Sequence, residues 1–223
     1  MLWGAAIAAG ARAYQKFGKN LKAQTLAILA SKKLVDAFVE NKGTANCLEI
    51  TEIDKSSTNW DMIFYFLIKG GSIGCVRLAN KFAPQAYKAI NDTFSEEITG
   101  IPESLPVSCA SILAEKMGLT DEQKMMVSGF AGGIGLCGGA CGALGAAVWI
   151  NAMKSSEENE GKVEFKDPRG LAVVEEFVKI SDYKFECKDI VGRKFESVQD
   201  HADYIQNGGC SEILEILAGE FKA

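Results

Sequence analysis

The chain of 223 residues is long enough to bury a substantial core without disulfide bonds or structural metals, as one large domain or two small ones. Its 48% hydrophobic and 24% charged residues are ordinary for a globular protein. A net charge of −5 without a basic stripe argues against nucleic-acid binding, and the single histidine, His201, excludes multi-histidine metal sites.

No stretch of the chain approaches the ~18 consecutive apolar residues of a membrane span. The apolar segment 2–11 also lacks the basic leader of a signal peptide. We therefore expect a cytoplasmic protein without a membrane partner. In that compartment thiols stay reduced unless they ligate a metal or cycle between redox states.

Helical signals dominate the first half of the chain. The segment 2–17 is rich in alanine, the strongest helix former, and predicts a helix. A second helix is predicted by apolar residues that share one face, with lysines and acids opposite: Leu26, Leu29, Leu34, Val35, Phe38 and Val39.

Start and stop signals mark two helices near the middle of the chain. A helix is predicted over 107–117, because Pro106 favours a helix start and Gly118 a helix end. Thr120, followed three residues later by Gln123, is typical of a capping box and predicts the start of the next helix.

The second half continues in the same way. Helices are predicted from 143 to about 153 and from 168 to 180, separated by a polar, acidic loop over 155–161. Strand alternation is nearly absent, and its best candidate is 162–166. We predict an all-α fold, a helical bundle.

The two halves resemble each other in four features that recur in the same order. The pairs are Gly4–Ile7 with Gly145–Val148, the helix ending at Val39 with the helix ending at Val178, Cys47 with Cys187, and Gly74-Cys75 with Gly209-Cys210. We predict two related units. Residues 1–96 form an incomplete first copy, residues 97–223 form a complete copy that carries the cysteines, and the boundary falls in 96–106.

Cysteines and glycines concentrate in the second half. Five of the seven cysteines lie there, around the glycine-rich segment 129–142: Cys109, Cys137, Cys141, Cys187 and Cys210. Thiolates are soft metal ligands and redox nucleophiles. Three of the five are predicted at or near helix starts, where free amides and partial positive charge lower the pKa of a thiol. Ligands on separate elements converge only in the folded state, as in iron–sulfur proteins.

These residues resemble a known family. Ser108-Cys109-Ala110, the run Gly129–Gly135, Gly139-Ala140-Cys141-Gly142-Ala143, and the downstream Cys187 and Cys210 are similar to the redox-active proteins named for their Cys, Gly-Cys-Ala-x-x-Gly, Cys, Cys signature. The same module is similar to part of split-Soret cytochromes c. The resemblance covers about residues 104–220, and the first half only as a partial second copy.

The resemblance implies that the family's cysteines are redox-active or hold a metal or iron–sulfur centre. The positions carried over as metal ligands are Cys109, Cys141, Cys187 and Cys210. The chain departs from the family pattern by adding Cys137 and by reading Gly-Ala-Cys-Gly-Ala around Cys141. It has no Cys-x-x-Cys-His, so covalent haem is not expected.

The glycine segment also admits other interpretations. Gly133–Gly138 satisfies the dinucleotide fingerprint literally, but a helical pattern precedes it where a strand is needed. No Lys-Ser/Thr follows it, which excludes a P-loop. We expect these glycines to allow close helix packing, or to present amides to the sulfur atoms of a bound centre. The candidates for such cofactor contacts are Gly133, Gly135, Gly139 and Gly142. His201 is a candidate ligand or proton donor, but a surface position is preferred.

The sequence therefore predicts a redox protein that holds a cysteine-ligated iron–sulfur or other metal centre for electron transfer to a partner protein. It would be a monomer with a pseudo-two-fold repeat or a homodimer. Two alternatives stay open. One is a thiol–disulfide couple of Cys137 or Cys109 with Cys141. The other is a non-catalytic interaction module whose cysteines only pack, which is the preferred interpretation for Cys47 and Cys75. No substrate or enzymatic reaction is identified.

Overall fold

The computed structural model describes residues 1–51, 53, 58–68, 70–95, 108–162 and 167–219. Within these ranges the chain forms helices joined by turns, and a single antiparallel bridge joins Ala140 to Glu186. The all-α prediction is confirmed. None of the helices in the described ranges has both the length and the apolar composition that crossing a membrane requires.

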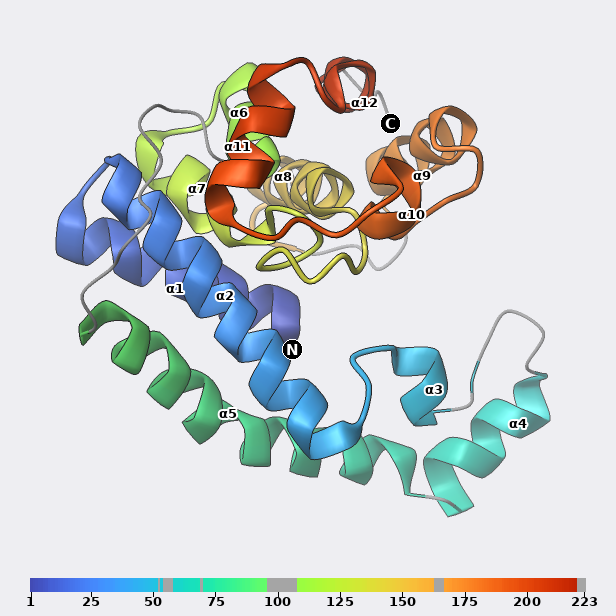
Figure 1. The fold of residues 1–223 in the computed structure, drawn as a ribbon. Coiled ribbons are helices and arrows are strands. Elements are labelled where there is room, and N and C mark those ends of the chain that lie inside the picture. The colour runs from blue at the N-terminus through green and yellow to red at the C-terminus, as the bar shows by residue number, and fades with distance from the viewer. Residues whose placement is uncertain (52, 54–57, 69, 96–107, 163–166, 220–223) are drawn as a thin grey trace.

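Three long helices build the N-terminal half. α1 (Leu2–Phe17) and α2 (Leu21–Lys42) form a hairpin around Gly18, and α5 (Gly71–Ser95) lies along α2 (Figure 1). Both α1 and α2 were predicted, and the predicted bounds of α1 are confirmed. The core between α2 and α5 follows from an apolar residue at every fourth position of α5: Leu78, Phe82, Ala86, Ile90 and Phe94.

Shorter elements connect α2 to α5. They are α3 (Cys47–Thr51), α4 (Asn59–Ile63) and a π-helical turn (Phe64–Ile68), and they lie at the N-terminal end of α5 (Figure 1). Cys47 and Cys75 are exposed here, so the preferred interpretation that they pack in the core is wrong.

The C-terminal half is built around α8 (Gly142–Glu158), which packs against α6 (Cys109–Lys116) and α9 (Pro168–Ile180). The buried residues of α8 repeat at helical spacing: Ala143, Ala146, Ala147 and Ile150. The predicted bounds of α9 are confirmed. The acidic loop predicted from 155 begins later, because α8 continues to Glu158 and buries Ser155.

The remaining helices enclose this half. α7 (Asp121–Met126) begins with the predicted capping box, in which the Gln123 amide N–H donates to the Thr120 hydroxyl at 3.3 Å. It is followed by a 3-10 turn (Ser128–Phe130). α10 (Cys187–Val191), α11 (Val198–Gln206) and α12 (Ser211–Leu217) complete the chain. The predicted boundary at 96–106 and residues 163–166 of the strand candidate lie outside the described residues.

The N-terminal helix α2 supports the glycine-rich segment of the C-terminal half. Ile28 of α2 packs in one apolar cluster with residues of that half: Ala131, Leu136, Phe195, Val198 and Ala202. At Gly135, a Cβ atom would lie 2.1 Å from the backbone nitrogen of Lys32. Only glycine allows this approach, so the prediction of close helix packing by the glycines is confirmed at this position.

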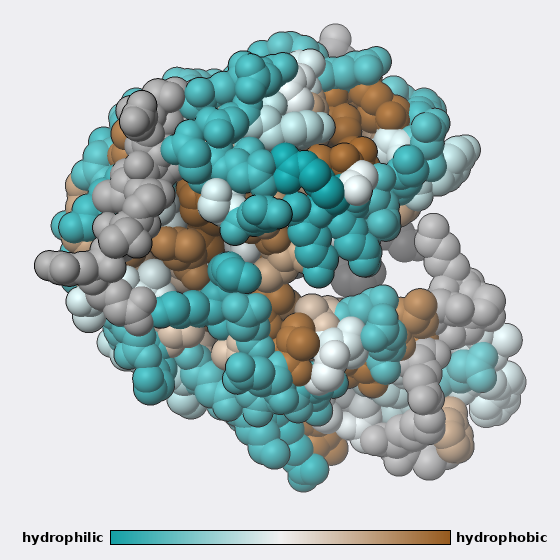
Figure 2. Space-filling view, viewed as in Figure 1, coloured by the Kyte–Doolittle hydropathy of each residue, from teal (hydrophilic) through white to brown (hydrophobic). Residues whose placement is uncertain are grey.

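The surface of the molecule is unevenly apolar (Figure 2). Among the described residues, seven of the twelve exposed large hydrophobic side chains come from the short connecting elements and the first turns of α5: Leu48, Trp60, Ile63, Phe64, Phe66, Ile73 and Val76. The C-terminal half buries its large side chains more completely. The compact part of the fold is therefore the half that carries most cysteines.

Candidate thiol site

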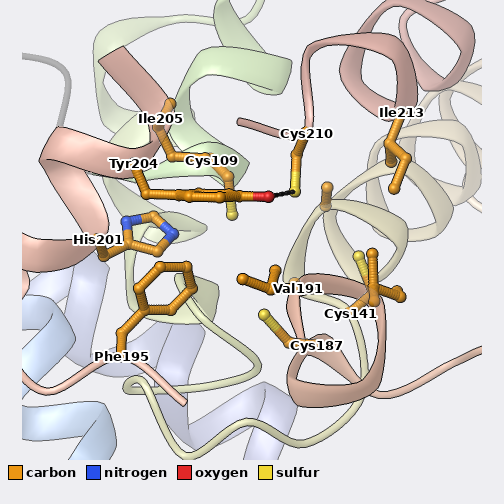
Figure 3. A pocket seen from close by; sticks show the side chains of 13 residues that line it. Cys109, Cys141, Cys187, Val191, Phe195, His201, Tyr204, Ile205, Cys210 and Ile213 are labelled. Atoms are coloured by element: carbon orange, nitrogen blue, oxygen red, sulfur yellow. Dashed lines mark hydrogen bonds between the residues drawn. The ribbon is translucent and has the colours of Figure 1, made fainter. Parts of the chain in front are cut away.

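Four cysteines from four separate elements line one pocket: Cys109, Cys141, Cys187 and Cys210 (Figure 3). Each stands at the N-terminus of a helix. Cys109 and Cys187 are the first residues of α6 and α10, and Cys141 and Cys210 are the N-cap residues of α8 and α12. All four are free thiols. The structure thus brings together the four cysteines that the family resemblance identifies as metal ligands.

The rest of the pocket is mainly apolar and aromatic. Its other lining residues are Gly142, Ala143, Ile190, Val191, Phe195, His201, Tyr204, Ile205 and Ile213. The cavity has a volume of about 20 Å³, which is enough for one water molecule or one metal ion. The thiols therefore face a small and mainly apolar space.

A backbone bridge brings Cys141 and Cys187 together. The amide N–H of Cys141 donates to the Phe185 carbonyl at 2.8 Å, and that of Cys187 donates to the Gly139 carbonyl at 2.7 Å. These bonds flank the antiparallel pair Ala140 and Glu186. Because side chains alternate across an extended strand, the two cysteines project from the same face of the bridge.

Cys109 is positioned by the buried cap of its helix. The Ser108 hydroxyl accepts a hydrogen bond from the Ser111 amide at 3.3 Å and donates one to the Ser128 carbonyl at 3.0 Å. The first bond begins α6 at Cys109, and the second ties this helix start to the turn that precedes the glycine-rich segment. Cys109 is 8% exposed as a result.

Cys210 is positioned by an unusual backbone and by a tyrosine. Its φ of 58° lies in the left-handed region, which costs a non-glycine residue roughly 1–2 kcal/mol. Its Sγ lies 4.0 Å from the Tyr204 hydroxyl, as the dashed line in Figure 3 shows. The Tyr204 ring lies so close to the backbone of Gly209 that a Cβ there would fall 2.3 Å from the ring.

Burial dominates the acid–base chemistry of the site. Burial raises the pKa of Cys141 to about 11 and that of Cys187 to about 12. The pKa of Cys109 is raised well above its ordinary value, first by burial and then by the charges of the other three thiols, and burial also raises the pKa of Cys210. The expectation that helix starts would favour thiolates is therefore wrong in its net direction, because desolvation outweighs the amides.

Backbone amides still act on two of the sulfur atoms. Hydrogen bonds from the backbone of Ala143 and Leu144 lower the pKa of Cys141, and one from Gly132 lowers that of Cys109, each less than burial raises it. Three predicted cofactor contacts, Gly133, Gly135 and Gly139, do not line the pocket, whereas Gly142 does. Gly133 and Gly139 lie against each other, because a Cβ on Gly133 would fall 2.5 Å from the Gly139 carbonyl oxygen.

Two further residues of the pocket are His201, which was named only as an alternative ligand or proton donor, and Tyr204, which was not predicted. His201 is 1% exposed and lines the pocket, so its preferred surface position is wrong. Phe195 packs edge-on against its ring at a centroid distance of 4.7 Å. Tyr204 gave no signal in the sequence beyond its place before the Gly-Gly-Cys of residues 208–210. Burial, followed by the charge of Cys210 and the bond to it, raises the pKa of Tyr204 to about 12, so the phenol keeps its proton at neutral pH.

Cys137 does not line the pocket. Its Sγ lies 3.6 Å from the Gly135 carbonyl, and burial and then the charge of Asp36 raise its pKa, against the opposing effects of two lysines. The structure therefore separates Cys137 from the four pocket cysteines, although it is only four residues from Cys141.

The donor set fits a thiophilic metal better than a harder one. Four thiols in an apolar pocket supply the soft ligands that iron–sulfur clusters and zinc take. In the described part of the chain, no three side chains of metal-binding type already stand at ligating distance from one point. Protonated thiols need not stand so close, and rotamer changes alone move their sulfur atoms. The donor set thus fits a thiophilic metal, but the thiols are not arranged around one ligating point, and a cluster would require them to move apart around a space larger than the present cavity.

Comparison with known proteins gives one match. A family model described as "Putative redox-active protein (C_GCAxxG_C_C)" matches residues 107–221, which is more than half of the chain. No curated protein and no solved structure shows significant similarity to the chain. The matched region contains all four pocket cysteines and Tyr204.

Proposed function

The chain belongs to the C_GCAxxG_C_C family of redox-active proteins, and from this premise we propose that its four pocket cysteines hold an iron–sulfur centre that transfers electrons. The observation that carries the proposal is the convergence of Cys109, Cys141, Cys187 and Cys210, from four elements, on one apolar pocket. Four thiolates are the usual complement of such a centre. When bound, the centre would supply one-electron redox chemistry.

The residues of the pocket have separable roles in this proposal. The bridge between Ala140 and Glu186 holds Cys141 and Cys187 on one rigid unit, whereas Cys109 and Cys210 approach from α6 and α12. The apolar walls exclude water, and solvent exclusion is one of the factors that set the potential of a metal centre.

Hydrogen-bond donors near the sulfur atoms are a second factor that sets the potential of a metal centre. Amides contact Cys109 and Cys141, and the Tyr204 hydroxyl contacts Cys210. Because the pKa of Tyr204 is about 12, its proton remains available to donate to a Cys210 thiolate. Such bonds stabilise the more negative, reduced state.

The same observations weigh against a thiol–disulfide couple. Nucleophilic cysteines have lowered pKa values, whereas burial raises the pKa values of Cys137, Cys141 and Cys109. Cys137 also lies outside the pocket. A set of buried thiols that ionise only together with a cation is more typical of metal ligands.

The test is anaerobic purification, with reconstitution by iron and sulfide, followed by iron and acid-labile sulfide analysis and electron paramagnetic resonance of the reduced protein. Wild type and Cys137→Ser are both expected to contain iron and sulfide, in a one-to-one ratio. Cys187→Ser is expected to lose both. The proposal fails if reconstituted wild type contains neither, if it holds zinc without sulfide, or if Cys187→Ser and Cys210→Ser retain the wild-type content.

A further inference from the structure

The turn that leads from α9 to the bridge between Ala140 and Glu186 has a strained backbone. Asp182 and Tyr183 both lie in the left-handed region, with φ of 49° and 62°. Elsewhere in the described residues, no two neighbouring non-glycine residues share this conformation. Such strain concentrates at functional sites. A simple helix end would use glycine or asparagine here, so the end of α9 does not by itself explain these two residues.

Hydrogen bonds hold the turn in this conformation. The Ser181 amide donates to the Phe177 carbonyl at 3.0 Å, and the Tyr183 amide donates to the Val178 carbonyl at 3.1 Å. A third bond, from the Lys184 amide to the Ser181 carbonyl at 3.0 Å, closes the turn. The backbone of the turn is thus fixed to the end of α9.

The strained turn exposes two aromatic side chains. Tyr183 is 78% exposed, a value that only Trp60 equals among the large hydrophobic residues of the described chain, and Phe185 is 41% exposed. A tyrosine at this exposure adds little to the core, so burial of its ring does not offset the strain. Tyrosine and phenylalanine are enriched in interfaces between proteins. The turn therefore has the composition of a contact surface.

The aromatic turn is joined to the thiol pocket. The Phe185 carbonyl accepts the hydrogen bond from the Cys141 amide at 2.8 Å, and Cys187, which is only partly buried, follows two residues later. The Phe185 ring lies 6.0 Å from the ring of Phe177, which packs in the same core cluster as Cys141. The path from Phe185 to either cysteine is thus one hydrogen bond or one intervening residue.

The half of the chain that carries the turn is acidic. Residues 97–223 contain 21 aspartates and glutamates against 12 lysines and arginines, a net charge of −9, whereas the rest of the chain has a net charge of +4. On the turn itself Asp182 and Lys184 have opposite charges, and Glu186 pairs with Lys188 at 2.6 Å. The field of this half therefore attracts a cationic partner, while the contact at the turn is mainly apolar.

We propose that the turn 181–185 is the surface on which an electron-transfer partner docks, a protein with an apolar contact patch and a positively charged rim. The proposal rests on the iron–sulfur centre proposed above. One electron passes from the reduced centre to the partner's acceptor group, so the centre is oxidised and the acceptor is reduced, with no bond formed or broken. Complexes of this kind bury less than about 1,200 Å², so two exposed aromatic residues supply a substantial part of the contact.

The kinetic test measures oxidation of the reconstituted, reduced protein by stopped flow. The oxidants are a basic cytochrome c in its ferric state and hexaammineruthenium(III), a small complex that needs no docking surface. Tyr183→Asn removes the ring but keeps the backbone, because asparagine tolerates the left-handed region. Tyr87→Asn, at a position of α5 that is 71% exposed, is the matched control.

We expect Tyr183→Asn to lower the second-order rate constant with cytochrome c at least about tenfold, as the loss of a central aromatic contact does in other interfaces. Tyr87→Asn should react at the wild-type rate, and both variants should retain the wild-type rate with hexaammineruthenium(III). The iron and sulfide contents of both variants should also equal those of wild type. An unchanged rate constant with cytochrome c in Tyr183→Asn overturns the proposal.

A binding measurement does not need the centre. Metal-free protein labelled with ¹⁵N is titrated with ferrocytochrome c, which is diamagnetic, and the amide chemical shifts are followed. The shifts should change mainly at residues 181–187, and the changes should disappear in Tyr183→Asn and at about 0.5 M salt. Changes that concentrate on another face, such as that of α5, also overturn the proposal. Wild type without iron and sulfide refutes the iron–sulfur centre instead, and the titration still decides whether the turn binds a basic protein.

Discussion

Burial of the four pocket thiols predicts a steep pH dependence of metal binding. At pH 7 a thiol with a pKa of about 11, as for Cys141, is ionised in about one molecule in 10⁴, at a cost of about 5 kcal/mol. The pKa of Cys187 is about 12, and burial raises the pKa of Cys109 and Cys210 as well. A metal bound by four thiolates must therefore displace about four protons.

The contrast with ordinary thiols is already large at pH 9. Four thiols with the unperturbed pKa of about 8.5 are three-quarters ionised at that pH, so binding would release only about one proton in total. Cys141 and Cys187 still hold nearly all of their protons there and would release two on their own, and Cys109 and Cys210 add to this number because their pKa values are raised as well. The affinity should then rise more than about 10²-fold for each unit of pH, compared with about tenfold for ordinary thiols.

The measurement is a competition between the protein and a chelator of known pH dependence for Cd²⁺ or Zn²⁺, at pH values between 7 and 9. Proton release on metal binding is measured in weakly buffered solution. The background is Cys47→Ser/Cys75→Ser, which removes the exposed thiols. Adding Cys187→Ser should reduce proton release by about one. Release of only about one proton at pH 9, or no change on adding Cys187→Ser, would refute the assignment of the pocket thiols as buried ligands.

The other predictions concern the tyrosine, the glycines, the strained backbone and alkaline stability. Tyr204→Phe removes a hydrogen bond worth about 0.5–1.5 kcal/mol, so the potential of the bound centre should fall by about 20–60 mV in voltammetry, and an unchanged potential contradicts this. Gly135→Ala should lower the free energy of unfolding by about 3 kcal/mol or more, because the new methyl group meets the α2 backbone, whereas Gly43→Ala, left-handed but with open space around it, should lose about 1 kcal/mol. In denaturant titrations of the metal-free protein, Cys210→Gly should be more stable than Cys210→Ala by about 1 kcal/mol, since only alanine retains the left-handed strain; equal stability would exclude that strain. The metal-free protein should also lose stability as pH rises above about 8.5, because unfolded thiols ionise there while Cys141 keeps its proton until about pH 11; a flat profile from pH 8 to 10 contradicts this.

Local signals in the sequence predicted much of the fold. The alanine-rich α1 and the proline-initiated α9 have the predicted bounds, and the capping box of Thr120 and Gln123 begins α7. These features act within a few residues, so they can be recognised in the sequence without knowledge of the tertiary structure. The helical extension through Ser155 was missed because its cause is burial against other elements.

The sequence predicted which cysteines form the site better than it predicted their chemistry. The resemblance identified the four cysteines that line the pocket, but Tyr204 and His201 are placed there by the packing of α11, which has no local signature. The sequence also could not predict the direction in which the pKa values of the thiols shift. Helix starts are visible in a sequence, whereas the desolvation that outweighs them at Cys141 depends on the whole pocket.

The insertion of Ile28 from α2 among residues of the matched region has a consequence for the family's architecture. A relative made only of the matched region would leave Ala131, Leu136 and Phe195 uncovered on one side, and Gly135 without the backbone that it touches. It would have to recruit an equivalent helix from a second subunit. Fusion of both halves in one polypeptide makes that support intramolecular, and thus independent of protein concentration.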